Sequence, residues 1–253
     1  MKLGTLDWGI GGLGVHQRLL ALGVADDALY LSDAGFTPYG KLEEDALAAR
    51  VAGCLERLSA AGCTHVVVGC NAASTVLSHP RVRHAAATLQ DVLGVISPTL
   101  DAVLAAPPAE VLVLGGARTV ASSLYARPLE AAGVRVRQRV AQPLSALIEA
   151  GVLEGPALDA CLDAICGPVS DARVVILACT HYPAVADAIA RRFPHLERCV
   201  DPSVETARVA HARWGMAHAP TRATTAWTTG DPAASGRTAL AAFGVEARFE
   251  RVP

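Results

Sequence analysis

Two cysteines stand at matching places in the sequence and are the residues best suited to chemistry. Cys70 ends the apolar run HVVVGC and Cys179 ends the run RVVILAC, and the two cysteines lie 109 residues apart. A polar residue follows each of them, Asn71 in the first case and Thr180 in the second. In open α/β sheets the ligand site lies beyond the carboxyl ends of the strands. The spacing therefore predicts two thiols that share one cleft.

A pair of opposed thiols suits the removal and return of a proton at a carbon atom. Racemisation needs one base that takes the α-proton from one face and one acid that delivers a proton to the other face. The α-carbon of an amino acid is a very weak acid, so the site must stabilise a carbanion-like transition state with fixed hydrogen bonds and excluded water. A helix is predicted to begin after each cysteine, and its positive end lies near the sulfur. We therefore expect the pKa of both thiols to be lowered.

Two further residues could tune these thiols. Asp7 closes the first predicted strand, and His181 lies two residues beyond Cys179. A solitary aspartate in a loop is usually a cap, and a solitary histidine is usually structural. A single cysteine at the end of an apolar strand is likewise usually a buried filler. The repetition of the arrangement around both cysteines favours chemistry over these structural roles.

The glycine-rich segment DWGIGGLGV has two interpretations. Gly9 to Gly14 match the bare pattern G-x-G-x-x-G, and Asp33 ends the second predicted strand, so dinucleotide binding stays open as an alternative. We favour the second interpretation, in which the glycines let backbone N–H groups approach a substrate carboxylate at the start of a helix.

The elements that must position these residues alternate along the chain. Short runs rich in Val and Leu predict strands, and the longer Ala-, Leu- and Arg-rich stretches between them predict helices. In the first series the strands are KLGTL, ALYLS and HVVVGC, with helices from about Val15 and through EEDALAARVAGCLERLSAAG. In the second series the strands are VLVLGG, VRVRQRV and RVVILACTH, with helices in TVASSLYARPLEAAG, PLSALIEAG and ALDACLDAICGPV. This alternation predicts parallel sheets with helices on both faces.

The repeat between the two series predicts two related lobes. An offset of 109 residues lays Leu3 and Thr5 over Leu112 and Leu114, and brings Asp7 over Gly116. Prolines and a break in the pattern at Pro98 and in APPAE predict the first crossing between lobes, and Asp201-Pro202 predicts the second. The segment RATTAWTTGDP then returns to the first lobe. We expect an α/β fold of two pseudo-symmetric parallel-sheet lobes with the active site between them: residues 1–97 plus 204–253, and residues 98–203.

Composition excludes several other classes of protein. The chain of 253 residues is 52% apolar and 18% charged with a net charge of −2, which is typical of a globular protein without a basic surface for nucleic acid. No apolar run approaches the roughly 18–20 residues that span a bilayer, and no signal peptide is recognisable, so we expect a cytoplasmic protein that does not bind membranes. The seven cysteines include no C-x-x-C pair, which predicts free thiols and no structural zinc.

The chain resembles the glutamate racemases, within the aspartate/glutamate racemase superfamily, from end to end. The resemblance runs through DWGIGGLGV, SDAGFTPYGKL, VVVGCNAAS, TVASSLY, PLSALIEAG, LACTHYP and TTGDP. It implies two pseudo-symmetric lobes and a cofactor-independent isomerase, with no metal, that interconverts L- and D-glutamate. It also implies that the product supplies peptidoglycan synthesis, and that the partner is a small amino acid. A homodimer is plausible for such a fold.

The resemblance also assigns site residues. It implies that Cys70 exchanges the proton of the D-isomer and Cys179 that of the L-isomer, and that Asp7, Asp33, Glu149 and His181 assist the thiols or shape the site. The residues implied in substrate binding are Asp7, Trp8, Pro38, Tyr39, Gly40, Asn71, Ala72, Thr119, Thr180 and His181.

Two positions depart from the family pattern. Trp8 stands where the family has Ser, and Ala72 stands where it has Thr. Each lost hydroxyl removes a partner for a charged ligand, at a cost of about 1–3 kcal/mol. Two alternatives therefore stay open: a superfamily racemase or epimerase with a different amino-acid substrate, and a binding protein without turnover whose site Trp8 blocks.

Overall fold

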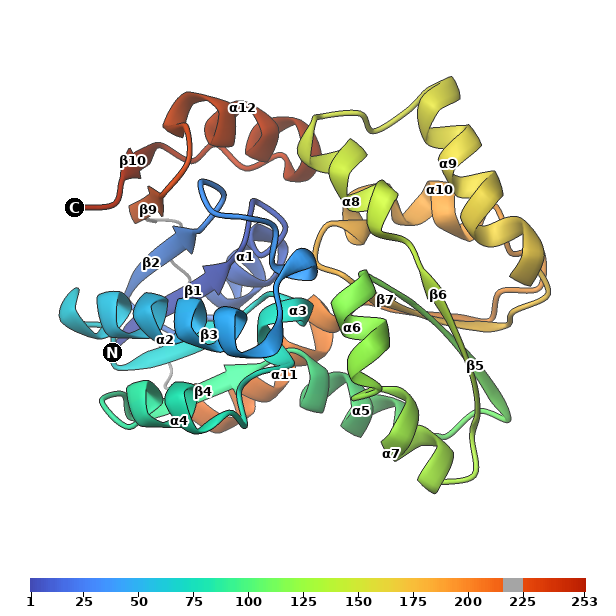
Figure 1. Ribbon diagram of the computed structural model, residues 1–253, viewed down its shortest axis with the longest axis horizontal. Helices are drawn as coiled ribbons and strands as arrows, with labels where there is room; N and C mark the ends of the chain where they lie inside the picture. The colour runs from blue at the N-terminus through green and yellow to red at the C-terminus, as the bar shows by residue number, and fades with distance from the viewer. Residues whose placement is uncertain (216–224) are drawn as a thin grey trace.

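The computed structural model describes residues 1–215 and 225–253, which form two lobes side by side (Figure 1). Each lobe is built on its own parallel sheet, and the two sheets have six and four strands in the described residues. This arrangement confirms the predicted α/β class with two parallel-sheet lobes.

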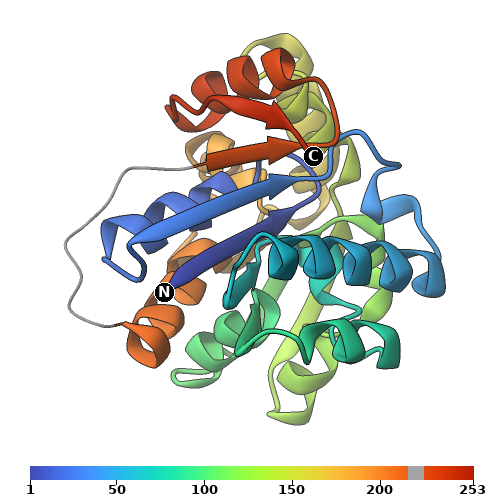
Figure 2. The same ribbon diagram turned by 90° about the vertical axis from the view of Figure 1, so that its left-hand side faces the viewer.

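The six-stranded sheet has the order β10-β9-β2-β1-β3-β4, and all its neighbouring strands are parallel. Figure 2 shows these strands stacked in one twisted layer. The strands are β1 (Lys2–Asp7), β2 (Asp27–Ser32), β3 (His65–Val68), β4 (Asp91–Gly94), β9 (Thr225–Thr228) and β10 (Phe249–Arg251).

Helices cover both faces of this sheet, as the apolar strands predicted. On one face, Leu6, Val66 and Val68 pack against α2 (Glu44–Ala60) and α4 (Pro80–Ala86). On the other face, Leu3 and Val67 pack against α1 (Leu13–Ala21) and α11 (Pro202–Trp214). The helix α12 (Pro232–Phe243) extends this second layer over β9 and β10. Successive strand residues thus point into opposite layers, because side chains alternate along a strand.

The four-stranded sheet has the order β6-β5-β7-β8 and is also parallel throughout. Its strands are β5 (Glu110–Gly115), β6 (Arg135–Val140), β7 (Val174–Ala178) and β8 (Arg198–Val200). Leu112, Leu114 and Leu177 pack on the face covered by α8 (Gln142–Glu149), α9 (Pro156–Cys166) and α10 (Ala186–Ala190). Val113 and Ile176 pack on the face covered by α5 (Ile96–Leu104) and α7 (Ala126–Ala131).

Short elements lie in the loops after the strands and, in one case, directly after α9. They are the helices α3 (Asn71–Ser74) and α6 (Ala117–Ser122) and the 3-10 turns η1 (Tyr39–Lys41), η2 (Gly167–Val169) and η3 (Tyr182–Val185). The single helix predicted over TVASSLYARPLEAAG is wrong, because the segment forms α6 and α7. Ser123 has a φ of 56°, and this left-handed conformation ends α6.

The internal repeat holds, but its offset is not constant. Leu6 pairs with Val68 in the first sheet, and Leu114 pairs with Leu177 in the second. From 68 to 177 the offset is 109 residues, whereas from 6 to 114 it is 108. The predicted match of Asp7 with Gly116 is therefore wrong by one residue, because the segments between the strands differ in length. In the register of the sheets, Asp7 corresponds to Gly115.

The chain passes from the first lobe to the second through α5, and it returns to the first lobe through the link from β8 to α11. Pro98 lies within the first turn of α5, and APPAE precedes β5. β9 pairs with β2 in the first sheet. The predicted segment RATTAWTTGDP begins at residue 222, and its first three residues lie outside the described part of the chain. The boundaries at 97/98 and 203/204 stay a prediction. Among the described residues, no helix has the length and apolar character needed to cross a membrane.

Candidate active site

The carboxyl ends of strands from both sheets meet in one pocket of about 310 Å³. Its walls come from the loops after β1, β2 and β3 in the first lobe and after β5, β6 and β7 in the second. The volume lies at the lower end of the range for small-molecule sites, about 300–1,000 Å³. Of the predicted site residues, those lining this pocket are Asp7, Trp8, Pro38, Tyr39, Gly40, Cys70, Asn71, Ala72, Thr119, Cys179, Thr180 and His181.

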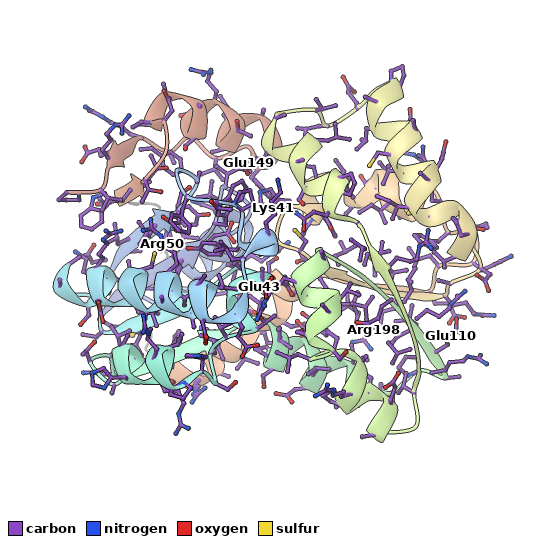
Figure 3. All side chains as sticks on the ribbon, viewed as in Figure 1. Lys41, Glu43, Arg50, Glu110, Glu149 and Arg198 are labelled. Atoms are coloured by element: carbon purple, nitrogen blue, oxygen red, sulfur yellow. The ribbon has the colours of Figure 1, made fainter. Side chains whose placement is uncertain are left out.

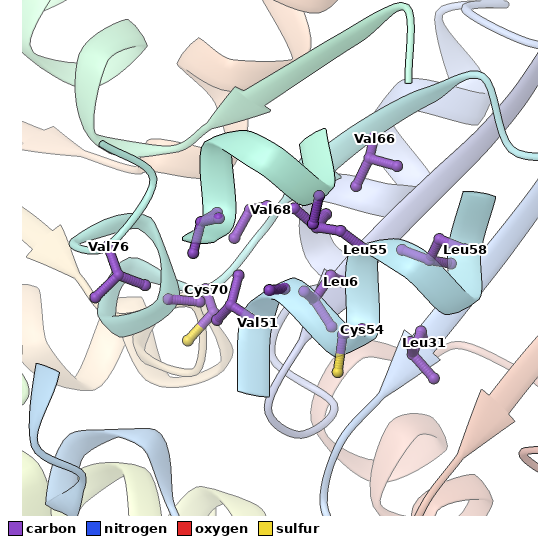
Figure 4. Close-up of a cluster of buried hydrophobic side chains, with 14 of the residues drawn as sticks. Leu6, Leu31, Val51, Cys54, Leu55, Leu58, Val66, Val68, Cys70 and Val76 are labelled. Atoms are coloured by element: carbon purple, nitrogen blue, oxygen red, sulfur yellow. The ribbon is translucent and has the colours of Figure 1, made fainter. Parts of the chain in front are cut away.

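Cys70 belongs at once to the pocket and to the hydrophobic core. Figure 4 shows it at the edge of the buried cluster, near Val51 and Val76. Burial, followed by the neighbouring charge of Asp7, raises the pKa of the Cys70 thiol well above its ordinary value. The prediction of a lowered pKa is wrong for Cys70: the helix after it, α3, spans only four residues, and its backbone N–H groups do not outweigh desolvation. Cys70 is therefore a neutral thiol at rest.

Cys179 directly follows β7 and has a charged neighbour. Its Sγ lies 3.7 Å from Nδ1 of His181, and the His181 Nε2 donates to Oε2 of Glu149 at 2.5 Å. Burial opposes protonation of His181, but the contacts with Cys179 and Glu149 outweigh it and raise the His181 pKa well above its ordinary value. His181 is thus an imidazolium, and its positive charge lies beside the Cys179 sulfur.

Glu149 is placed at the boundary between the lobes (Figure 3). It is the last residue of α8, the helix whose first turns line the pocket, and its Oε2 also accepts from the backbone N–H of Ile10 at 3.4 Å. Glu149 therefore contacts His181, which in turn contacts Cys179. It also joins α8 to the glycine-rich loop of the first lobe.

Asp7 is fully buried beneath the pocket and accepts three hydrogen bonds. Its Oδ2 accepts from the backbone N–H groups of Gly9 at 3.2 Å and Gly12 at 3.0 Å, and its Oδ1 accepts from the Thr180 hydroxyl at 3.2 Å. Burial raises its pKa, while His181 and the Gly12 N–H act in the opposite direction. The glycine N–H groups expected to receive a substrate carboxylate thus bind Asp7 instead. Because these N–H groups donate to Asp7, they are not available to the phosphate groups of a dinucleotide.

Asn71 presents an unpaired donor. Its Oδ1 accepts from the Tyr125 hydroxyl of the second lobe at 2.8 Å, which fixes the orientation of the amide. Its Nδ2 is buried and has no hydrogen-bond partner among the described residues. Because an unpaired buried donor costs free energy, this atom marks a place for an acceptor of the ligand.

Asp33 does not reach the pocket. Its carboxylate is fully buried and forms an ion pair with Arg50, accepting from Nε at 2.7 Å. It also accepts from the hydroxyls of Tyr39 at 2.7 Å and Thr229 at 2.9 Å. The Asp33 carboxylate is thus connected to the site through Tyr39, which lines the pocket.

Trp8 lines the pocket without closing it. Its indole Nε1 donates to the backbone carbonyl of Phe36 at 3.0 Å, and its ring packs against the first-lobe core. The indole is thus fixed to the loop after β2, and the pocket stays open beside it. Ala72 lines the same pocket on the Cys70 side.

Sequence reasoning missed several pocket residues that follow strands β5 and β6. They are Gly116, Gln142, Pro143, Ser145 and Ala146, together with Lys41 of η1 and Ala178. A signal for them existed, since Gly116 and Gln142 come directly after predicted strands, as Cys70 and Cys179 do. Among the described residues, no group of three or more His, Cys, Asp or Glu side chains is arranged to hold a metal ion.

The fold and the pocket define a class: an α/β protein of two parallel-sheet lobes whose shared ligand site carries one cysteine from each lobe. Comparison with known proteins agrees with this class. The family model described as Asp/Glu/Hydantoin racemase matches residues 25–210.

Curated relatives place the chain within that class. The glutamate racemase of Deinococcus radiodurans is 33% identical over 215 residues, which are 82% of this chain and 73% of that protein. The glutamate racemase of Cupriavidus pinatubonensis is 34% identical over 196 residues, 74% of this chain and 69% of that protein. The chain therefore belongs to the Asp/Glu/Hydantoin racemase family, and the resemblance to the glutamate racemases is confirmed.

Solved structures show the same fold. The glutamate racemase of Thermus thermophilus, in complex with beta-chloro-D-alanine, has a TM-score of 0.85 at 27% identity and covers 99% of this chain and 96% of its own. The glutamate racemase of Francisella tularensis, in complex with D-glutamate, has a TM-score of 0.87 at 21% identity over 100% and 97% of the two chains, a likeness of fold alone. The relatives do not favour the alternative of a different substrate.

Proposed function

We propose that this protein is a glutamate racemase that interconverts L- and D-glutamate with two thiols and no cofactor. The observation that carries the proposal is the placement of Cys70 and Cys179, one from each lobe, in the walls of a single small pocket. The glutamate racemases among its relatives support the choice of substrate.

The two thiols have different neighbours, and this difference supports an order of proton transfers. Beside the His181 imidazolium, Cys179 acts as the thiolate base for L-glutamate, and its sulfur takes the α-proton. The C–H bond breaks and leaves its electron pair on the α-carbon. The neutral thiol of Cys70 then gives its proton to the opposite face, which forms D-glutamate and leaves a thiolate on Cys70. In the reverse direction the two cysteines exchange roles.

Other pocket residues hold the amino acid during these transfers. The unpaired Nδ2 of Asn71 donates to a substrate carboxylate, and Asp7 holds the Thr180 hydroxyl at the opposite wall. Donors that are fixed before the substrate arrives stabilise the carbanion-like transition state without reorganising. Tyr39 and Gly40 line the pocket from the loop after β2 and take up space that water would otherwise occupy.

Incubation with L-glutamate in D₂O tests the proposal. We expect D-glutamate that carries deuterium at the α-carbon, because the incoming proton comes from a thiol that exchanges with solvent. The substitutions Cys70→Ser and Cys179→Ser should each lower racemisation by about 10²–10⁴-fold, the contribution typical of a positioned acid or base. Cys199→Ser is the matched control, because this thiol is exposed and lies in β8, which contributes no residue to the pocket. Absence of both D-isomer and α-deuterium with the unaltered protein rejects the proposal.

The proposal includes a physiological part: a cytoplasmic enzyme that supplies D-glutamate for peptidoglycan. All seven cysteines are free thiols, and the mechanism needs two of them reduced, a state that the cytoplasm maintains. Expression in a bacterium that requires D-glutamate should restore growth without the supplement, and Cys70→Ser should not. A homodimer is part of the same proposal, and light scattering at micromolar concentration measures it.

A further inference from the structure

Gln142 is the first residue of α8 and follows the carboxyl end of β6, where its side chain lines the pocket. We infer that Gln142 determines substrate specificity by donating a hydrogen bond from its Nε2 to the side-chain carboxylate of the substrate. The inference rests on the proposed function and deepens it, because it names the part of the pocket that recognises the distal acidic group.

The hydrogen bonds of Gln142 determine the orientation of its side-chain amide. Its Oε1 accepts from the backbone N–H of Ala117 at 3.2 Å, and a backbone N–H can only donate. Its Nε2 donates to Ser145 Oγ at 3.2 Å, and the Ser145 hydroxyl in turn donates to the Gln142 carbonyl at 2.8 Å. The oxygen is thus occupied, whereas the second N–H of Nε2 has no acceptor among the described residues.

Two glycines leave the space that this amide fills. A Cβ atom on Gly116 would lie 2.8 Å from Gln142 Oε1, and a Cβ atom on Gly40 would lie 2.6 Å from it. Gly116 belongs to the second lobe and Gly40 to the first, so the amide is held between the lobes. Both distances are shorter than real Cβ contacts, so a side chain at either position displaces the amide.

The strand order puts Gln142 at the right distance from the reacting carbon. Cys179 follows β7, Gly116 follows β5 and Gln142 follows β6, and these strands are successive neighbours in the sheet. Two strand spacings separate Cys179 from Gln142, about 10 Å. An α-carbon between the two thiols, followed by two methylene groups and a carboxylate, extends toward the Gln142 amide over this span.

The fixed polarity of the amide selects the chemistry of the distal group. A free N–H donor binds a carboxylate oxygen with a charge-assisted hydrogen bond, which is stronger than a neutral one. Because Oε1 accepts from the Ala117 N–H, the amide presents the free N–H of Nε2 to the distal group. This donor favours an acidic side chain over its amide, because the charge-assisted hydrogen bond is stronger than the neutral one that an amide oxygen accepts.

The test is steady-state racemisation of glutamate, in both directions, by Gln142→Leu and Gln142→Glu. For Gln142→Leu we expect KM to rise at least tenfold with kcat within about threefold, and for Gln142→Glu a larger rise because two carboxylates then face each other. Gln90→Leu, at an exposed position of the first lobe, is the matched control and should leave both constants unchanged. An unchanged KM, or a loss confined to kcat, overturns the inference. Inactivity of the unaltered protein overturns the proposed function instead.

A second variant tests the same contact without changing Gln142. Gly116 has φ −67° and ψ 162°, a conformation that alanine adopts freely, so Gly116→Ala acts through its Cβ on the amide. We expect Gly116→Ala to raise KM as Gln142→Leu does, and to add less than a twofold rise when it is combined with Gln142→Ala. Fully additive effects of the two substitutions contradict the inference.

Discussion

At the scale of single residues, the two thiols of the pocket have unequal surroundings. Cys70 is surrounded by hydrophobic core and a buried carboxylate, whereas Cys179 lies beside an imidazolium. The same residue type at matching places of a repeat therefore has different electrostatic surroundings in the two lobes. The difference comes from the neighbours that each lobe supplies, chiefly Asp7 for Cys70 and His181 for Cys179.

Glu149 sets the charge of His181, which yields a prediction of pH dependence. Glu149 raises the His181 pKa, so Glu149→Gln lowers it toward its ordinary value. The imidazolium is present below this pKa and is lost as pH rises through it. We expect the alkaline limb of the pH profile of kcat/KM to move to lower pH in Glu149→Gln, because the carboxylate that raises the His181 pKa is removed. Glu154→Gln, at an exposed residue after α8, should leave the limb in place. A limb that does not move contradicts this role of Glu149.

At the scale of elements, the loop from β2 to η1 is held by one buried carboxylate. Asp33 directly follows β2, binds Arg50 of α2, and accepts from the hydroxyls of Tyr39 and Thr229, which come from η1 and the loop after β9. The Arg50 guanidinium also lies 4.3 Å from the ring centre of Phe36. Elements distant in sequence thus converge on Asp33, and they place Tyr39 in the pocket wall.

Asp33→Asn separates a positioning role from a role in proton transfer. Removal of one partner from a buried ion pair costs about 3–5 kcal/mol, and the partial exposure of Arg50 places the expected loss at the lower end, about 3 kcal/mol. We expect a lower free energy of unfolding in urea and a higher KM, with an unchanged pH profile of kcat. A shifted pH profile with normal stability would instead show that Asp33 acts on the thiols.

At the scale of the whole molecule, side chains of each lobe complete the site of the other. Thr180 of the second lobe donates to Asp7, Glu149 accepts from Ile10, and Arg118 of α6 forms an ion pair with Glu44 at 3.3 Å. These contacts surround the pocket, so its geometry depends on how the two lobes lie against each other. Neither lobe alone contains both thiols or a closed pocket.

Tyr125→Phe tests this dependence with the loss of one oxygen atom. The Tyr125 hydroxyl orients Asn71 from the opposite lobe, so its removal frees the amide to rotate. A neutral hydrogen bond contributes about 1 kcal/mol, which corresponds to about a fivefold rise in KM. We expect kcat and the melting temperature to change little, since the buried ring stays in place. Equal KM values for the two proteins would show that Asn71 needs no such support.

Much of this protein follows from the sequence by itself. The alternation of Val- and Leu-rich runs with helical stretches predicts the strands, because the period of a strand or helix is a local property of the chain. The position of Cys70 and Cys179 at strand ends predicts a shared site, because parallel strands end at the same edge of a sheet. The short strands β4 and β8 were missed, since a run of three or four residues has no clear period.

Tertiary structure alone decided the contacts between residues far apart in the chain. It fixed the 108-residue offset of the first strands, the ion pair of Asp33 with Arg50, and the place of Gln142 between Gly40 and Gly116. It also decided that the Cys70 thiol is neutral, because a pKa depends on burial and on neighbouring charges from other elements. Tertiary packing brings these groups together, so the distances between them cannot be read from their spacing along the sequence.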